Sequence, residues 1–268
     1  MRVFKILGML KTLSRILKLT SIMKQYLKID EKMTPQEKRQ QAQRERFKKI
    51  KPSWDDTMVI FSRLFGEIIK PRTELLDVGC GRGNAIIDDY RLQIINATGI
   101  DIDHEAVEGN TRLDRIVIGN IEKLPFPDRT FDIVISQWVI EHLKNPERVF
   151  AECYRVLKPG GYFLFVTPYA YSSIILIKRM VGSSLTKKIL KFIYGREEKD
   201  CFETMYRANT PEVLSNQLSK AGFKPDELIK NPDPSYWGFN NAIFNIALFF
   251  EKIFPKHTTM HLIGRFKK

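Results

Sequence analysis

Residues 75–84, which read LLDVGCGRGN, constrain the fold of this chain more than any other segment. An apolar run ends in Asp77, and glycines follow at positions 79, 81 and 83. Glycine lacks a Cβ atom, tolerates positive φ and lets a ligand approach the backbone. The pattern therefore predicts a buried strand, a tight turn and the start of a helix. Because the spacing is G-x-G-x-G and an acid precedes it, we expect a ligand with an ammonium or sulfonium group rather than a dinucleotide.

Four further segments continue the alternation of strand and helix. The first of them ends in acids about 20 residues beyond the glycines, where a carboxylate can accept both hydroxyls of a ribose. Strands that alternate with helices predict a parallel sheet with helices on both faces, and a ligand crevice at the carboxyl ends of the strands. The four segments are residues 94–103, 118–126, 131–143 and 156–166.

On these five motifs the chain resembles the class I S-adenosylmethionine-dependent methyltransferases, in particular the methyltransferase type 11-like branch that acts on small molecules. The resemblance covers residues 72–167 and implies an α/β fold: a doubly wound, mostly parallel seven-stranded sheet, Rossmann-like, with its last strand antiparallel. We expect a helical extension over residues 1–51 and the methyltransferase domain over 52–268. Within that domain we expect a first helix at 84–90, a lid insertion at about 168–207 and an apolar helix at about 239–254.

The resemblance also implies S-adenosyl-L-methionine as the cofactor. Asp77 would hold the ammonium group, Asp101 the ribose hydroxyls and Ile102 the adenine ring. Asn120 stands where relatives often carry Asp, and its amide oxygen can still accept from the adenine amino group. The cofactor-binding positions that the resemblance implies are Asp77, Gly79, Cys80, Gly81, Asp101, Ile102, Asn120, Ile121 and Gln137.

The expected chemistry asks little of the protein, because a sulfonium methyl group is already activated and its transfer depends on positioning. A general base helps only where the acceptor loses a proton. His142 is the candidate catalytic residue, and the alternative for it is a local hydrogen bond within a helix. Tyr169, Tyr206 and Arg207 are candidates for contact with the acceptor, although core packing explains the tyrosines equally well. We expect no metal, because the three cysteines lack the spacing of metal ligands.

The net charge of +13 is concentrated at the N-terminus. Residues 1–51 hold 15 of the 44 Lys and Arg but only four of the 31 Asp and Glu, so the remainder is nearly neutral and a nucleic-acid substrate is not favoured. Residues 1–28 carry seven basic residues and no acid. They predict an amphipathic helix that lies on an anionic membrane, or one that packs over the cleft or against a second subunit in a homodimer. The odd number of widely spaced cysteines favours the cytoplasm, with possible attachment to the inner face of the membrane.

The acceptor is predicted from weaker signals. Residues 206–211, which read YRANTP, are similar to a segment of bacterial methyltransferases that act on polysaccharides and lipid-linked glycans. We therefore predict O-methylation of a glycan or lipid-linked intermediate. The alternatives are C-methylation of a quinone- or sterol-like lipid, a non-catalytic cofactor-binding scaffold, and an RNA methyltransferase.

Overall fold

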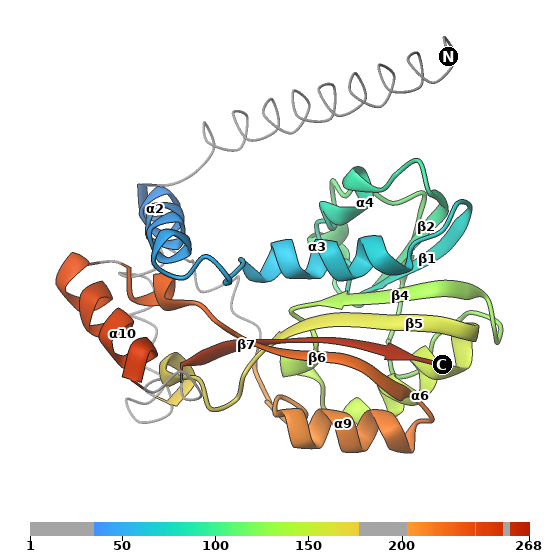
Figure 1. Ribbon diagram of the computed structural model, residues 1–268. Helices are drawn as coiled ribbons and strands as arrows, with labels where there is room; N and C mark the ends of the chain where they lie inside the picture. The colour runs from blue at the N-terminus through green and yellow to red at the C-terminus, as the bar shows by residue number, and fades with distance from the viewer. Residues whose placement is uncertain (1–34, 177–202, 239, 254–257) are drawn as a thin grey trace, which may run out of the picture.

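The computed structural model describes residues 35–176, 203–238, 240–253 and 258–268 (Figure 1). Seven strands form one sheet in the order β3-β2-β1-β4-β5-β7-β6. All neighbouring pairs are parallel except β5 with β7 and β6 with β7. The predicted doubly wound sheet with an antiparallel last strand is confirmed. The strands are β1 Thr73–Val78, β2 Ile94–Asp101, β3 Arg115–Ile118, β4 Phe131–Gln137, β5 Leu157–Pro168, β6 Lys224–Pro232 and β7 Thr259–Lys267.

Helices cover both faces of the sheet, with α3 on one face and α6 and α9 on the other (Figure 1). The core accordingly forms two large apolar clusters, one on each side of the strands. Because the central strands are covered on both faces, they are apolar runs rather than alternating ones. The helices are α2 Pro35–Ile50, α3 Thr57–Ile68, α4 Ile86–Asp89, α5 His104–Val107, η1 Ile140–His142, α6 Pro146–Val156, α9 Pro211–Lys220, η3 Pro234–Trp237 and α10 Asn241–Ile253.

The first helix after the glycine loop is shorter than predicted. Residues 84–90 were expected to be helical, but α4 spans only Ile86–Asp89. Asn84 lies outside the helix because its side-chain oxygen accepts from the backbone N–H of Ile86. At the other end Tyr90 turns away, packs edge-on against Phe65 and donates to the carbonyl of Ser62. These tertiary contacts end the helix after one turn.

Helix α2 lies in the predicted N-terminal extension, and one of its faces is buried. Phe47 packs edge-on against Trp54 and belongs to a small apolar cluster with Phe244 of α10. Arg44 forms an ion pair with Asp233, a carboxylate that is buried beside η3. Arg44 therefore links the charged helix α2 to the far end of the chain.

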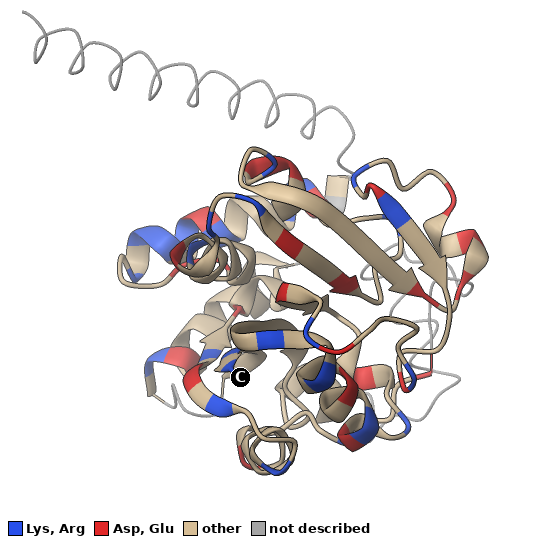
Figure 2. Ribbon diagram, turned by 90° about the vertical axis from the view of Figure 1, so that its right-hand side faces the viewer, with Lys and Arg blue, Asp and Glu red and all other residues tan. Residues whose placement is uncertain are grey.

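Two predictions fall largely outside the described residues: the amphipathic helix at 1–28 and the lid insertion at about 168–207. Residues 173–176 are helical, and residues 203–210 return to the loop after β4. Basic and acidic positions are interspersed over the described fold, as Figure 2 shows. Among the described helices, none combines the length and apolar character needed to cross a bilayer.

Candidate active site

The glycine loop joins β1 to α4 at the carboxyl end of the sheet. Gly79 has φ +73°, and a Cβ atom there would lie 2.3 Å from Cγ2 of Val139, in the loop after β4. Gly79 is thus required both by its backbone conformation and by the close approach of a neighbouring loop. Gly81 also has positive φ, but a Cβ atom there would meet only one side-chain oxygen of Asp101, at 4.0 Å. The space beside Gly81 is where a ligand can approach the backbone.

Asp101 ends β2 and is fixed beside this loop. The backbone N–H of Gly81 donates to its Oδ2 at 2.8 Å, and that of Asp103 donates to its Oδ1 at 3.0 Å. Asn110 completes the arrangement by donating to the carbonyl of Gly81 at 2.8 Å. Each carboxylate oxygen keeps lone-pair capacity for a further donor. Ile102, the next residue, is 74% exposed and offers an apolar surface on which a flat ring can pack.

Asp77 is the clearest sign that the loop binds a cation. Its side chain is 2% exposed, and among the described residues its Oδ2 atom has no hydrogen-bond partner. Burial, together with the charge of Asp101, raises the pKa of Asp77 to about 7. A buried carboxyl group without a partner is costly, and a ligand ammonium group would satisfy it. The residues present therefore fit the amino-acid end of S-adenosylmethionine.

The positions expected at the adenine end lie on the next two strand ends. Asn120 is exposed, and its Oδ1 accepts from the backbone N–H of Glu122 at 2.8 Å, which shapes the turn after β3. Ile121 is half-buried against the core. Gln137 ends β4, and its buried Nε2 has no partner among the described residues, so a donor is available there. Cys80 and Cys153 are both buried free thiols, so Cys80 stands in the glycine loop without a disulfide bond to Cys153.

The loop after β4 holds a buried carboxyl group that the sequence analysis did not single out. Glu141 is 4% exposed, accepts from the hydroxyl of Thr167 at 3.0 Å, and has its pKa raised to about 7 by burial. Its backbone carbonyl accepts from the N–H groups of Met205 and Tyr206. The signal in the sequence was an acid directly after the apolar residues 138–140.

His142 lies beside Glu141 and contacts the same returning segment. Its Nδ1 lies 2.7 Å from the carbonyl of Glu203 and donates to it, so in the neutral ring Nε2 is the basic nitrogen. The hydrogen bond orients the imidazole and also holds residue 203 in place. The geometry is compatible with a general base and with the local role that the sequence analysis considered as its alternative.

The three candidate acceptor residues lie along the same edge but do not form one cluster. Tyr169 follows β5 and packs edge-on against Tyr171, 5.8 Å away. Tyr206 has φ +50° in the segment that returns to Glu141. Arg207 donates to the carbonyl of Lys144 at 2.8 Å, so one of its donors ties that segment to the loop after η1.

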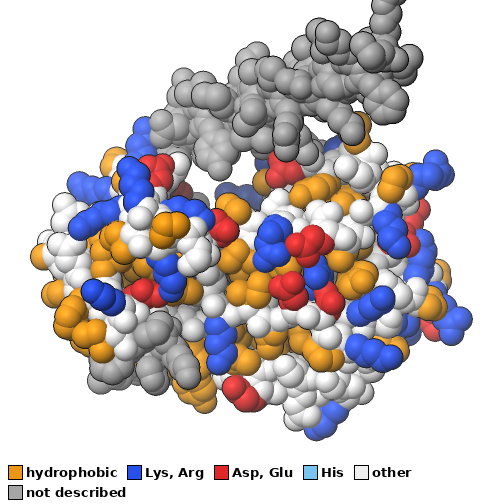
Figure 3. Space-filling view, viewed as in Figure 1, with side chains coloured by type: hydrophobic (Ala, Val, Ile, Leu, Met, Phe, Trp, Pro, Cys, Tyr) orange, Lys and Arg blue, Asp and Glu red, His pale blue; other side chains and the backbone are white. Residues whose placement is uncertain are grey.

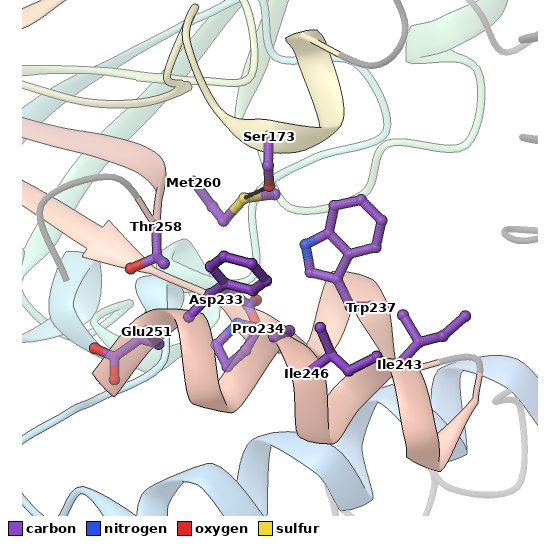
Figure 4. Close-up of a pocket in the computed structure, with 11 residues that line it drawn as sticks. Ser173, Asp233, Pro234, Trp237, Ile243, Ile246, Glu251, Thr258 and Met260 are labelled. Carbon is purple, nitrogen blue, oxygen red and sulfur yellow. Dashed lines mark hydrogen bonds between the residues drawn. The ribbon is translucent and has the colours of Figure 1, made fainter. Parts of the chain in front are cut away.

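A cavity of about 640 Å³ opens at this edge, beyond the ends of β6 and β7. Figure 4 shows side chains from η3, α10 and β7 around it, including Trp237, Ile246 and Met260. Its two carboxylates are already paired, Asp233 with Arg44 and Glu251 with Lys51. The sequence predicted the apolar helix but not the cavity. The lining residues are Ser173, Asp233, Pro234, Trp237, Ile243, Ile246, Ala247, Phe250, Glu251, Thr258 and Met260.

The cavity and the glycine loop are linked through β4 and β7. The ring of Trp138, directly after β4, packs edge-on against His261 of β7 at 5.0 Å. His261 is buried, lies 3.0 Å from the hydroxyl of Tyr236 in η3, and has its pKa lowered to about 4 by burial. This neutral histidine connects the loop after β4 with the short helix that lines the cavity.

Known proteins similar to this chain include methyltransferases. Residues 76–165 match a family described as a methyltransferase domain. A probable S-adenosylmethionine-dependent methyltransferase of Mycolicibacterium smegmatis is 40% identical over 100 residues, which are 35% of this chain and 38% of that protein. A demethylmenaquinone methyltransferase of Symbiobacterium thermophilum is 33% identical over 153 residues, 49% of this chain and 60% of that protein. A sterol 24-C-methyltransferase of Gibberella zeae is 36% identical over 104 residues, 35% of this chain and 27% of that protein.

The chain thus spans less than two thirds of the length of these relatives. Among solved structures, an S-adenosylmethionine-dependent methyltransferase of Mesorhizobium loti has a TM-score of 0.54 at 16% identity, covering 77% of this chain and 95% of that one. A geranyl diphosphate C-methyltransferase of Streptomyces coelicolor, solved with S-adenosyl-L-homocysteine, has a TM-score of 0.52 at 14% identity, covering 77% of each chain. These structures share the fold. The motifs, the sheet order and the matching segment agree, so residues 76–165 form a methyltransferase domain of the class I S-adenosylmethionine-dependent type.

Proposed function

We propose that this protein transfers a methyl group from S-adenosylmethionine to a carbon atom of an apolar, lipid-like acceptor. The observation that carries the proposal is the apolar cavity at the edge of the sheet where the cofactor residues lie. Its volume falls in the range of small-molecule sites, about 300–1,000 Å³. The names of the relatives, a demethylmenaquinone and a sterol 24-C-methyltransferase, support this choice more than the glycan O-methylation that the sequence analysis ranked first.

The cofactor, when bound, supplies a methyl group on a positively charged sulfur. The chain's own contribution is to hold the two ends of that molecule. Asp77 would bind the ammonium group, and Asp101 would accept from the ribose hydroxyls while it fixes Gly81 through the backbone N–H. Ile102, Asn120 and the neighbouring Ile121 would contact the adenine ring. Holding the donor and acceptor in line accounts for most of the rate of such a displacement.

The acceptor would occupy the cavity with its apolar part. Trp237, Ile243 and Phe250 exclude water there, and the two carboxylates of the lining are neutralised by partners outside it. A charged or heavily hydroxylated glycan would have few groups to replace its lost hydration in such a lining. An isoprenoid or sterol skeleton has few polar groups, so it would lose little hydration free energy on entering the cavity.

A carbon acceptor that gains a methyl group must lose a proton, and His142 is the proposed base. We expect His142→Ala to lower the rate of transfer about 100-fold or more, the range for loss of a general base. Its affinity for S-adenosylmethionine, measured by calorimetry, should stay within about twofold, since no cofactor contact is assigned to the ring. If affinity fell in step with the rate, His142 would act by holding residue 203 rather than as a base.

The proposal is tested in two steps. Calorimetric titration with S-adenosylmethionine and S-adenosylhomocysteine first shows whether one site per chain binds the cofactor. Tritiated S-adenosylmethionine is then supplied with the lipid and the glycan fractions of a cell extract, each separately. Label in the lipid fraction alone supports the proposal. Label in the glycan fraction restores the first prediction, and cofactor binding without label in either fraction points to the non-catalytic scaffold.

Filling the cavity should block the acceptor without touching the cofactor. Ala247 faces the cavity from α10, so Ala247→Phe is expected to reduce lipid methylation at least tenfold at unchanged cofactor affinity. The matched control is Val59→Phe, which adds bulk at an exposed position of α3. Equal methylation by Ala247→Phe and wild type would place the acceptor elsewhere.

We further propose that the protein is cytoplasmic and attaches peripherally to the membrane through residues 1–28. Their basic, amphipathic composition supports this, and liposome flotation of chains with and without those residues tests it. We also propose that the acceptor is a small molecule and not a nucleic acid. The homodimer is likewise a proposal.

A further inference from the structure

Helix α10 presents a continuous apolar stripe on its exposed side. The spacing of its members, three to four residues, places them on one face of the helix. Two larger side chains, Phe249 and Phe250, are more than half exposed, and their rings contact each other edge-on. The opposite face of α10 carries the buried Phe244 and Glu251. We call the exposed face the α10 stripe; its members are Ala242, Ile246, Phe249 and Ile253.

The stripe borders the mouth of the cavity. Ile246 and Phe250 both line the cavity and are 55% and 51% exposed, so they form its rim. Figure 4 shows Ile246 and Ile243 rising from α10 toward this space. An apolar ligand that leaves the cavity past α10 would therefore meet the stripe before it meets water. Clustered exposed apolar side chains of this kind mark an interaction surface.

Two cations flank the stripe. The guanidinium of Arg46, on α2, donates to Asn245 of α10 at 2.8 Å and lies over the ring of Phe244. Lys252 is exposed in the last turn of α10. The one acid in that helix, Glu251, is buried and paired with Lys51. In Figure 3, hydrophobic side chains gather at the left end, over α10, with Lys and Arg side chains above them, over α2.

We propose that the α10 stripe docks on an anionic lipid bilayer and orients the cavity mouth toward it. Apolar side chains flanked by Lys and Arg are the pattern of a helix that lies at a membrane surface. The rings would enter the acyl region while Arg46 and Lys252 meet lipid phosphates. A lipid acceptor would then pass from the bilayer into the cavity without crossing water. The α10 stripe does not include residues 1–28. The proposal rests on the function proposed above only in taking the methyl acceptor to be a lipid.

Vesicle co-sedimentation of the full chain tests the proposal. The double variant Phe249→Ser/Ile253→Ser should bind vesicles of phosphatidylcholine with 30% phosphatidylglycerol at least tenfold more weakly, by an estimate from the apolar area lost. The matched control is Val59→Ser/Leu92→Ser, which removes two exposed apolar side chains that belong to α3 and to the loop before β2 rather than to α10, and it should bind like wild type. Lys252→Glu should weaken binding to the anionic vesicles only.

A second measurement locates the contact directly, whatever residues 1–28 do. Phe249→Cys, in a Cys201→Ser background where Cys80 and Cys153 are buried, is labelled with nitrobenzoxadiazole. The fluorescence emission of this label should shift to the blue when vesicles are added, and brominated acyl chains should quench it. The emission of a label at Leu92→Cys should neither shift nor be quenched. The proposal would be overturned if the double variant bound vesicles as tightly as the wild type and the emission of the label at residue 249 did not change. Loss of a wild-type dimer in the double variant would also overturn it, since a second copy would then cover the stripe.

Activity separates this proposal from the function proposed above. The double variant should keep its affinity for S-adenosylmethionine and its methyl transfer to a lipid extract dispersed in detergent. Only transfer to the same lipids embedded in vesicles should fall, at least tenfold by the same estimate. If the wild type methylated the lipids in neither form, the lipid function itself would be wrong. If the double variant methylated lipids in vesicles as fast as the wild type, the docking surface would be wrong.

Discussion

Asp101→Ala is expected to weaken the binding of S-adenosylmethionine about 100-fold or more. The variant removes an acceptor for two ribose hydroxyls, and hydrogen bonds to a charged group contribute about 1.5–3 kcal/mol each. It also removes the partner of the Gly81 N–H, which holds the glycine loop at 2.8 Å from Oδ2. Isothermal calorimetry with the cofactor and with S-adenosylhomocysteine measures both losses together.

Asp103→Ala is the matched control for that result. Asp103 is an acid two residues away, and its Oδ1 accepts from the N–H groups of Glu105 and Ala106 at the start of α5. Its removal should cost about 1 kcal/mol of stability through the lost helix cap and leave cofactor affinity nearly unchanged. If Asp103→Ala lost affinity and Asp101→Ala did not, the assignment of the ribose site at the end of β2 would be wrong.

Asp77→Asn is expected to change stability and cofactor binding in opposite directions. Burial raises the pKa of Asp77 from 3.8 to about 7 in the folded protein. The folded state therefore holds a proton that the unfolded state has lost, so stability falls as pH rises from about 4 to about 7. Above pH 7 this group costs at most roughly 4 kcal/mol, and the uncharged amide should recover part of it. The variant without cofactor should consequently melt at a higher temperature at pH 8 than the wild type.

Cofactor affinity of the wild type should rise with pH over the range in which its stability falls. An ammonium group needs the ionised carboxylate, so wild-type affinity should rise by up to about tenfold per pH unit below pH 7 and then level off. Binding below pH 7 should release a proton, which calorimetry detects by comparing buffers of different ionisation enthalpy. Asp77→Asn should bind weakly at every pH. Affinity that is independent of pH in the wild type would show that Asp77 does not meet the ammonium group.

Glu141→Gln provides the control for this pH dependence. Burial likewise raises the pKa of Glu141 to about 7, so its replacement should also flatten the dependence of stability on pH between about 4 and 7. The hydroxyl of Thr167 can still donate to the amide oxygen of the variant. Because Glu141 forms its hydrogen bonds with Thr167, Met205 and Tyr206 and none with the glycine loop, the pH profile of cofactor affinity should match that of the wild type.

Local signals were sufficient for the sheet and for the cofactor loop. The strands β1, β4 and β5 are buried on both faces, so they appear in the sequence as apolar runs, and Gly79 and Gly81 mark the turn where the backbone needs positive φ. Helix ends were less predictable, because α4 stops where Tyr90 finds Phe65 and Ser62. Those partners lie on a helix that precedes β1, and no pattern within residues 84–90 encodes them.

The acceptor side was beyond what local patterns can show. The cavity is enclosed by η3, α10 and β7, together with Ser173, which are far apart in the chain. Likewise the partner of Asp233 is Arg44, 189 residues earlier, in a helix that reads as a solvated charged run. Glu141 became notable only when its burial was known, whereas His142 was a candidate from its residue type and its place after the fourth strand.

The order of strands and helices, the position of the glycine loop and the acids Asp77 and Asp101 at two strand ends could all be predicted from local patterns. Such predictions succeed because periodic burial and backbone conformation constrain residues that are close in the chain. Local patterns did not predict which polar groups are buried without partners, where an apolar cavity opens or that the α10 stripe lies at its mouth. Those properties depend on the distances between distant segments, which are set when the two faces of the sheet are covered.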